Sequence, residues 1–162
     1  MVLFILLIYY LRNAAMKLSQ KGEYGIGALL ELASRYGEGS VQANTIAARR
    51  GIPAQYLQQI LLTLRRAGLI RSERGPHGGH ALARSPAEIT LLEAMQALEG
   101  TAAPAPCADP TAQPACGRQE LCALLEVWRR VDSATEAILR AVTLADLAQR
   151  ERELNDSVMY YI

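Results

Sequence analysis

The sequence predicts a mostly α-helical protein with one small β-hairpin: a winged helix-turn-helix domain followed by a long dimerisation helix. Two short amphipathic stretches are joined by a three-residue turn, which is the spacing of a helix-turn-helix. A glycine-rich segment then lies between two short strand-like runs, and heptad-spaced apolar residues follow near the C-terminus. Hydrophobic residues make up 51% of the chain and aromatic residues only 6%, so aliphatic helices can form its core.

The first predicted helix covers residues 19–36, where apolar side chains recur at helical spacing. Ser19 can cap its beginning, and Gly37 and Gly39 end it. A second short helix, residues 44–50, follows with Asn44 as its cap.

A tight turn at residues 51–53 leads into the third helix, which Pro53 opens and Gly68 ends. Its periodicity predicts a buried stripe of Leu57, Ile60, Leu61 and Leu64. Residues 69–72 and 81–84 are strand-like runs around a glycine-rich turn, which predicts the wing hairpin. A further helix, residues 90–99, ends at Gly100, so residues 16–100 form the predicted winged helix-turn-helix domain.

Residues 101–119 are rich in alanine and proline and are expected to form a loop. The segment 120–155 is expected to form a dimerisation helix and a short terminal helix, with Thr143 as a cap and a loosely ordered tail from Glu151. A heptad seam over three repeats favours a second copy of the chain, although burial against the chain's own core explains it nearly as well. The seam consists of Leu121, Leu124, Trp128, Val131, Thr135, Ile138 and Val142.

Residues 1–15 differ from the rest of the chain. Val2–Leu11 is an unbroken apolar run that is too short to span a bilayer as a helix. Because the sequence after Met16 is typical of a soluble domain, we expect Met16 to be the functional start and residues 1–15 to come from an upstream start codon. A membrane anchor or interfacial segment is the alternative.

The three cysteines of the chain, Cys107, Cys116 and Cys122, lie close together in the sequence, and two of them fall in the 101–119 loop. Thiolates grouped in this way select zinc, copper(I) or an iron–sulfur centre. A disulfide with one spare thiol and chance clustering are the simpler alternatives. The odd count argues against a secreted disulfide framework and indicates reduced, cytoplasmic thiols.

Charge is unevenly distributed although the net charge is only +1. Residues 44–84 contain one acid, Glu73, and seven arginines: Arg49, Arg50, Arg65, Arg66, Arg71, Arg74 and Arg84. A local basic surface of this kind suits DNA, but a solvated helix face has the same composition. His77 and His80 suit phosphate contact or simple exposure better than a metal. No pattern of catalytic residues indicates an enzyme or a small-molecule substrate.

Several motifs occur together in a fixed order. They are Met16-Lys-Leu-Ser-Gln-Lys-Gly-Glu-Tyr-Gly, Tyr56-Leu-Gln-Gln, Arg74-Gly-Pro-His-Gly-Gly, the cysteine loop and Thr143-Leu-Ala-Asp-Leu. From Met16 to about Ala148 the chain resembles the winged helix-turn-helix iron–sulfur transcription regulators of the IscR and NsrR type. The resemblance implies a homodimeric transcription factor that binds double-stranded promoter DNA.

The resemblance also assigns the DNA contacts. It implies a recognition helix over residues 53–67. In IscR-like proteins a glutamate stands at the position of Gln58, so sequence preference is expected to differ here. The implied contacts are Gln55, Gln58 and Gln59 to base edges, Tyr56 beside the backbone, Arg74 in the minor groove, and Lys21, Arg65 and Arg66 to phosphates.

The resemblance implies an iron–sulfur cluster, [2Fe–2S] or [4Fe–4S], held by Cys107, Cys116 and Cys122. Eight residues rather than the usual five separate the first two cysteines, which indicates a lengthened loop. Leu125 stands where IscR-like proteins have a histidine ligand. NsrR-like proteins use an acid from the partner subunit, and Glu23 occupies that position.

Two alternatives remain open from the sequence. One is a thiol-redox or zinc-dependent regulator on the same fold without a cluster. The other is a membrane-tethered scaffold that uses residues 1–11 as its anchor. For Glu23, the alternative is a plain surface carboxylate or an ion-pair partner of Arg35 or Lys21.

Overall fold

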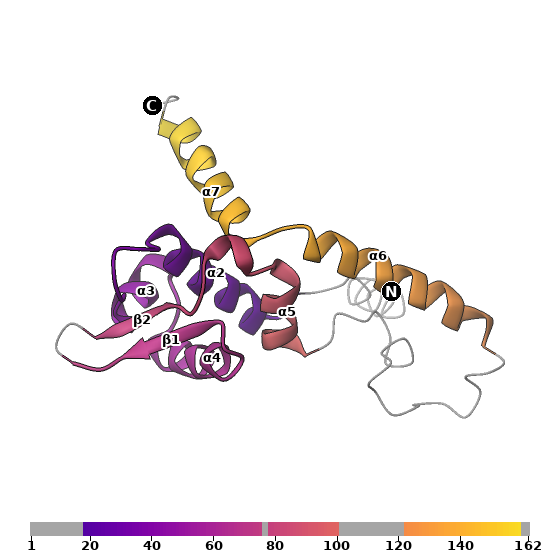
Figure 1. Cartoon of the computed structure of the whole chain (residues 1–162), viewed down its shortest axis with the longest axis horizontal. Helices are drawn as coiled ribbons and strands as arrows, with labels where there is room; N and C mark the ends of the chain where they lie inside the picture. The colour runs from indigo at the N-terminus through magenta and orange to yellow at the C-terminus, as the bar shows by residue number, and fades with distance from the viewer. Residues whose placement is uncertain (1–17, 76–77, 101–121, 160–162) are drawn as a thin grey trace, which may run out of the picture.

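The computed structural model describes residues 18–75, 78–100 and 122–159. Figure 1 shows a helical body with a hairpin at one edge. The long helix α6 extends from this body to one side, and the last helix, α7, projects from it in another direction. The elements in chain order are α2 (Gln20–Ser34), α3 (Ala43–Arg50), α4 (Ala54–Arg66), β1 (Ile70–Glu73), β2 (Gly79–Leu82), the 3-10 helix η1 (Pro86–Glu88), α5 (Leu91–Glu99), α6 (Ala123–Arg140) and α7 (Leu144–Met159).

The first helix, α2, begins and ends close to the predicted residues. The Ser19 side chain accepts a hydrogen bond from the backbone N–H of Gly22 at 3.1 Å, so the predicted cap is confirmed. After the helix, Gly37 and Gly39 both take positive φ values, which glycine adopts without a steric penalty.

The helix-turn-helix consists of α3, the turn at residues 51–53 and α4. Gly51 takes the left-handed conformation with φ 62°, which turns the chain between the two helices. The predicted buried stripe on α4 is confirmed, because its buried residues are Leu57, Ile60, Leu61 and Leu64.

The predicted Asn44 cap of α3 is wrong. The helix begins at Ala43, and Asn44 lies inside it. Val41 is held in an extended bridge to His80, so the extended chain ends at Gln42, whose carbonyl accepts the first helical bonds from Thr45 and Ile46. This contact between distant residues sets the start of the helix, so the start cannot be predicted from the neighbouring residues alone.

The hairpin is antiparallel and pairs Ile70 with Leu82 and Glu73 with Gly79. Its second strand begins at Gly79, two residues before the predicted run. The reason is the same bridge: Val41 and His80 exchange two backbone hydrogen bonds of 2.8 Å, which add a short third segment beside β2. A Cβ at Gly79 would lie 2.5 Å from the Val41 carbonyl oxygen, so only glycine permits this approach.

The beginnings of α5 and α7 are joined. Thr90 and Thr143 form an isolated antiparallel bridge, and each threonine caps its own helix, with Glu93 and Asp146 respectively completing the hydrogen bonds. Two backbone bonds, from Leu91 to Val142 and from Leu144 to Ile89, measure 2.8 and 2.9 Å. This arrangement fixes the α6–α7 junction against the body.

The last helix is longer than predicted. The segment after Glu151 was expected to be loosely ordered, but α7 continues to Met159. Glu151 binds Arg50 of α3 through two hydrogen bonds of 2.5 and 2.8 Å, which ties the middle of α7 to the body.

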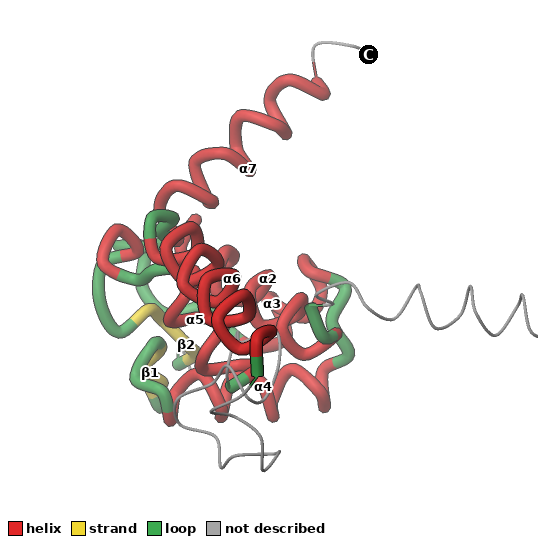
Figure 2. The backbone as a smooth tube through the Cα atoms, turned by 90° about the vertical axis from the view of Figure 1, so that its right-hand side faces the viewer, coloured by secondary structure: helices red, strands yellow, loops and turns green. Residues whose placement is uncertain are grey.

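The core lies where α2, α3, α4, α5 and the beginning of α7 meet (Figure 2). Its largest fully buried side chains are Leu29, Ile46, Leu57, Ile60, Leu61, Leu64, Leu82, Ile89 and Leu144. Within the described ranges, no helix combines the length and the apolar character needed to cross a bilayer. The apolar run of residues 1–15 and the 101–119 loop lie outside the described residues.

Candidate nucleic-acid interface and cysteine site

The outer face of α4 presents amides. Gln55, Gln58 and Gln59 are exposed, because the opposite face of the helix carries the buried leucine and isoleucine stripe. Tyr56 is only partly exposed, and its ring packs edge-on against Tyr24 with the ring centres 5.9 Å apart. This contact holds the beginning of α4 against α2, so the three glutamines project from a fixed helix.

Arg74 follows β1 at the described end of the wing. Its side chain is exposed, and it makes no ion pair with any residue in the described ranges. Gly75 follows with φ 124°, which turns the chain after it. A long, unpaired cation at this position can reach beyond the body toward a groove of DNA.

The seven arginines of residues 44–84 divide into two groups. Four of them form ion pairs with acids of the chain: Arg49 with Glu31, Arg50 with Glu31 and Glu151, Arg71 with Glu73, and Arg84 with Glu93. Arg65 and Arg66, in the last turn of α4, are exposed and have no acidic partner among the described residues. Arg65, Arg66 and Arg74 are therefore the exposed arginines of residues 44–84 that make no ion pair with a described residue.

Lys21 has a role that the sequence did not indicate. Its ammonium group donates a hydrogen bond of 2.6 Å to the carbonyl of Leu98, near the end of α5. A cation at the C-terminal end of a helix satisfies a free carbonyl and the helix dipole. The predicted phosphate contact of Lys21 therefore competes with an internal one.

Glu31 is the centre of an ion network that sequence reasoning missed. It is 3% exposed, and its carboxylate contacts Arg35 at 3.3 Å, Arg49 at 2.9 Å and Arg50 at 3.3 Å. The hydrogen bonds between Arg50 and Glu151 raise the pKa of the guanidinium and lower the pKa of Glu151. Only the i, i+4 spacing of Glu31 and Arg35 could have indicated part of this network, which joins α2, α3 and α7.

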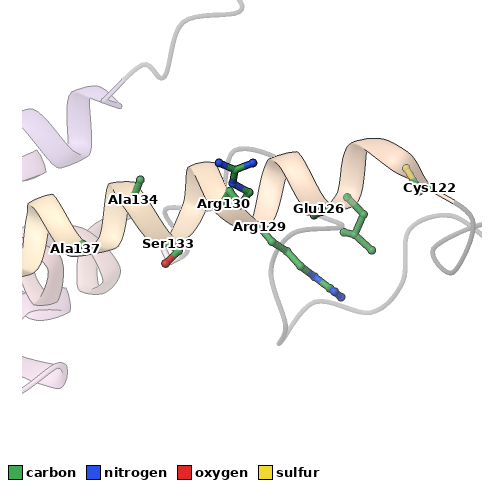
Figure 3. Close-up of a pocket in the computed structure, with 8 residues that line it drawn as sticks. Cys122, Glu126, Arg129, Arg130, Ser133, Ala134 and Ala137 are labelled. Atoms are coloured by element: carbon green, nitrogen blue, oxygen red, sulfur yellow. The ribbon is translucent and has the colours of Figure 1, made fainter.

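Cys122 stands immediately before α6 as its N-cap residue, with a free and partly exposed thiol (Figure 3). It does not use its side chain to cap the helix. A groove along α6 continues from it past Glu126, Arg129 and Arg130. The first turn of a helix favours negative charge, which suits thiolate ligands and a bound cluster.

The other two predicted thiol ligands, Cys107 and Cys116, lie outside the described residues. Accordingly, no group of three metal-binding side chains is found within residues 18–75, 78–100 and 122–159. Leu125, at the position where the resemblance implied a histidine, is buried and aliphatic, so it supplies no ligand atom.

Glu23 is exposed in the first turn of α2, and its carboxylate has no partner among the described side chains. Neither of the alternative partners pairs with it, because Arg35 contacts Glu31 and Lys21 contacts Leu98. In one chain, Cys122 lies at the end of α6 that points away from the body (Figures 1 and 3).

A known protein family matches most of the chain. The model of the family Rrf2, described as "Iron-dependent Transcriptional regulator", matches residues 18–150. This chain belongs to the Rrf2 family. It is therefore a DNA-binding transcription regulator of winged helix-turn-helix fold and not an enzyme. The predicted fold class is confirmed.

Individual Rrf2-family proteins resemble the chain over most of its length. The HTH-type transcriptional regulator CymR of Bacillus subtilis is 35% identical over 147 residues, which cover 91% of this chain and 100% of CymR. The structure of CymR of B. subtilis, described as the global cysteine regulator, has a TM-score of 0.66 at 34% identity and covers 83% of this chain and 97% of that one. The structure of T. potens IscR has a TM-score of 0.65 at 33% identity, with 85% and 90% covered.

Proposed function

We propose that this Rrf2-family protein is a homodimeric regulator whose DNA binding responds to an iron–sulfur cluster. Cys107, Cys116 and Cys122 supply three thiolates, and Glu23 of the partner supplies the fourth ligand. The observation that carries the proposal is the pair of free groups at Cys122 and Glu23. Each has the donor atom that the cluster needs, and neither is bound to another described residue.

The DNA-binding surface is the amide face of α4 together with Arg74. An α-helix fits the major groove, where glutamine pairs with adenine by donating and accepting together. Gln55, Gln58 and Gln59 are exposed on a helix whose other face is buried, which supports this role. Arg74 then reaches the adjacent minor groove, while Arg65 and Arg66 contact phosphates.

Replacing Arg74 with alanine should weaken specific DNA binding by roughly 1–3 kcal/mol, because it removes the groove contact of the wing. The operator is first selected from random duplexes, and binding is then measured by fluorescence anisotropy. Arg71→Ala is the matched control, since Arg71 lies on the same strand region but pairs with Glu73. Equal affinity for Arg74→Ala and the unchanged protein would sink the assignment.

Dimerisation is supported by the exposed apolar face of α6. In a single chain, Leu124 is 60% exposed, Val131 41% and Ile138 68%, and all three belong to the predicted heptad seam. Leaving such a stripe in water is unfavourable, and a second copy of the same helix would bury it. Two copies would also bring two recognition helices to two half-sites.

Val131→Glu should therefore weaken the dimer by roughly tenfold or more, because it places a charge in an apolar contact. Sedimentation velocity over a dilution series measures the change. Ser133→Glu is the matched control, as it adds the same charge to the opposite face of α6 and should leave the dimer intact. A dimer of unchanged affinity in Val131→Glu would show that this face is not the interface.

The chemistry of the donors fits a cluster that is easily lost. Thiolates bind iron strongly, whereas a carboxylate is a harder and weaker donor. When bound, such a cluster supplies a site that oxidants, nitric oxide or iron limitation can alter. Glu23 stands in the first turn of α2, and α2 packs on α4, so its position is coupled to the recognition helix.

A thiol-based or zinc-dependent regulator without a cluster is the second candidate. It is favoured by the similarity to CymR, which is described as the global cysteine regulator of B. subtilis. Three clustered thiols could respond by reversible oxidation or hold zinc.

Anaerobic purification with iron, sulfide and zinc analysis separates the two. About two or about four iron and sulfide per subunit support the cluster. Stoichiometric zinc, or free thiols with no metal after reconstitution, support the second candidate.

A further inference from the structure

A cleft of about 300 Å³ lies between the recognition helix α4 and the wing. Its two walls come from different elements, one from α4 and the other from the facing strands β1 and β2. The lining residues are Gln58, Leu61, Leu62, Arg65, Ser72 and His80.

The polar groups of this cleft can all donate hydrogen bonds. Gln58 has an amide and Arg65 a guanidinium, and both side chains are exposed. The Ser72 hydroxyl lies 3.1 Å from Nδ1 of His80, which leaves Nε2 of the ring without a hydrogen-bond partner among the described residues. No carboxylate is among the lining residues, so the cleft has the chemistry of an oxyanion site.

The position of the cleft between α4 and the wing indicates which oxyanion it binds. With α4 in the major groove and the wing in the neighbouring minor groove, one sugar–phosphate strand separates the two elements. That strand has to cross the gap between them, which is this cleft. We propose that the cleft binds one backbone phosphate of duplex DNA through Arg65 and protonated His80, so that DNA affinity rises as the pH falls. The inference rests on the proposed mode of DNA binding.

The surroundings of His80 determine the sign of the effect. In the free protein, burial and then the charge of Arg65 lower the pKa of His80 below its ordinary value. From β1, Arg71 and Glu73 form a pair with each other, and the Val41 segment contacts His80 through backbone atoms. A bound phosphate offsets the charge of Arg65 and favours the imidazolium, so DNA binding raises the pKa of His80.

DNA binding therefore takes up a proton. The gain in affinity begins as the pH falls through the higher pKa of the complex, and it levels off below the lower pKa of the free protein. Each unit of difference between the two pKa values corresponds to about a tenfold change in affinity. Without the His80 side chain, this component disappears while the Arg65 contact stays.

The test is fluorescence anisotropy with the selected operator duplex, from about pH 8 to about pH 5.5 at constant ionic strength. We expect the affinity of the unchanged protein to rise about tenfold or more over this range. His80→Gln keeps a polar side chain of similar size but should show a much smaller rise. His77→Gln, which removes the other histidine of the chain, should retain the rise.

The outcomes are distinct. An equal rise in His80→Gln and the unchanged protein, or loss of the rise in His77→Gln alone, would overturn the phosphate site while leaving DNA binding intact. Absence of any operator binding at every pH would overturn the proposed function itself. As a direct readout, NMR titration of the His80 ring should give a higher pKa in the complex than in the free protein. An unshifted or lowered value would contradict the proposal.

Discussion

We expect the Cys122→Ala variant to lose its bound iron and sulfide. The proposed cluster is held by three thiolates and one carboxylate, and two thiolates with a weak carboxylate are not enough to keep it bound. The variant should fold normally, since Cys122 makes no side-chain hydrogen bond at the start of α6. Iron and sulfide per subunit after anaerobic reconstitution measure the loss. Far-UV circular dichroism checks that the helices remain.

The matched control is Glu126→Gln, which changes another side chain of the same groove, one turn further along α6. It should keep its full iron content. If Cys122→Ala retained as much iron as this control, Cys122 would not be a ligand of the cluster.

Glu31→Ala should lower the free energy of unfolding by about 1–3 kcal/mol, because it removes a buried carboxylate that accepts hydrogen bonds from Arg49 and Arg50. Arg50 then keeps only Glu151, and α2 loses its ionic connection to α3. Urea denaturation followed by circular dichroism measures the change. A loss below about 0.5 kcal/mol would mean that the network contributes no net stability.

Glu23→Ala provides the comparison on the same helix. Its carboxylate is exposed and has no described partner, so its removal should change stability by less than about 0.5 kcal/mol. It should instead make the cluster decay faster in air, as followed by visible absorption. The two glutamates thus separate a structural role from a ligand role. An unchanged decay rate would exclude Glu23 as the fourth ligand.

Helical periodicity and capping residues predicted the helices well wherever no contact with a distant segment changes where a helix begins. The stripe on α4 follows from its period, and Ser19 and Thr143 cap their helices as predicted because the hydroxyl acts within three residues. The errors occur where distant segments meet. Val41 pairs with His80 and thereby moves both the start of α3 and the start of β2.

For the site, the sequence implied contacts by the glutamines of α4 and by Arg74 only through the family resemblance, and the structure shows that these side chains are exposed. The sequence could not assign the partners of the charges. Composition groups Arg49 and Arg50 with the basic surface, yet both bind Glu31, and Arg50 also binds Glu151, which is far away in the chain.

The sequence by itself therefore determined the fold class, the helix-turn-helix and the hairpin, while the family resemblance supplied the candidate ligands. Only the tertiary structure decided which charges remain free, that Lys21 binds the end of α5, and that His80 and Arg65 share a cleft. The physical reason is the sequence separation over which each interaction acts. Periodicity, caps and turns act over a few residues, whereas ion pairs and clefts depend on which distant segments the packed core brings together.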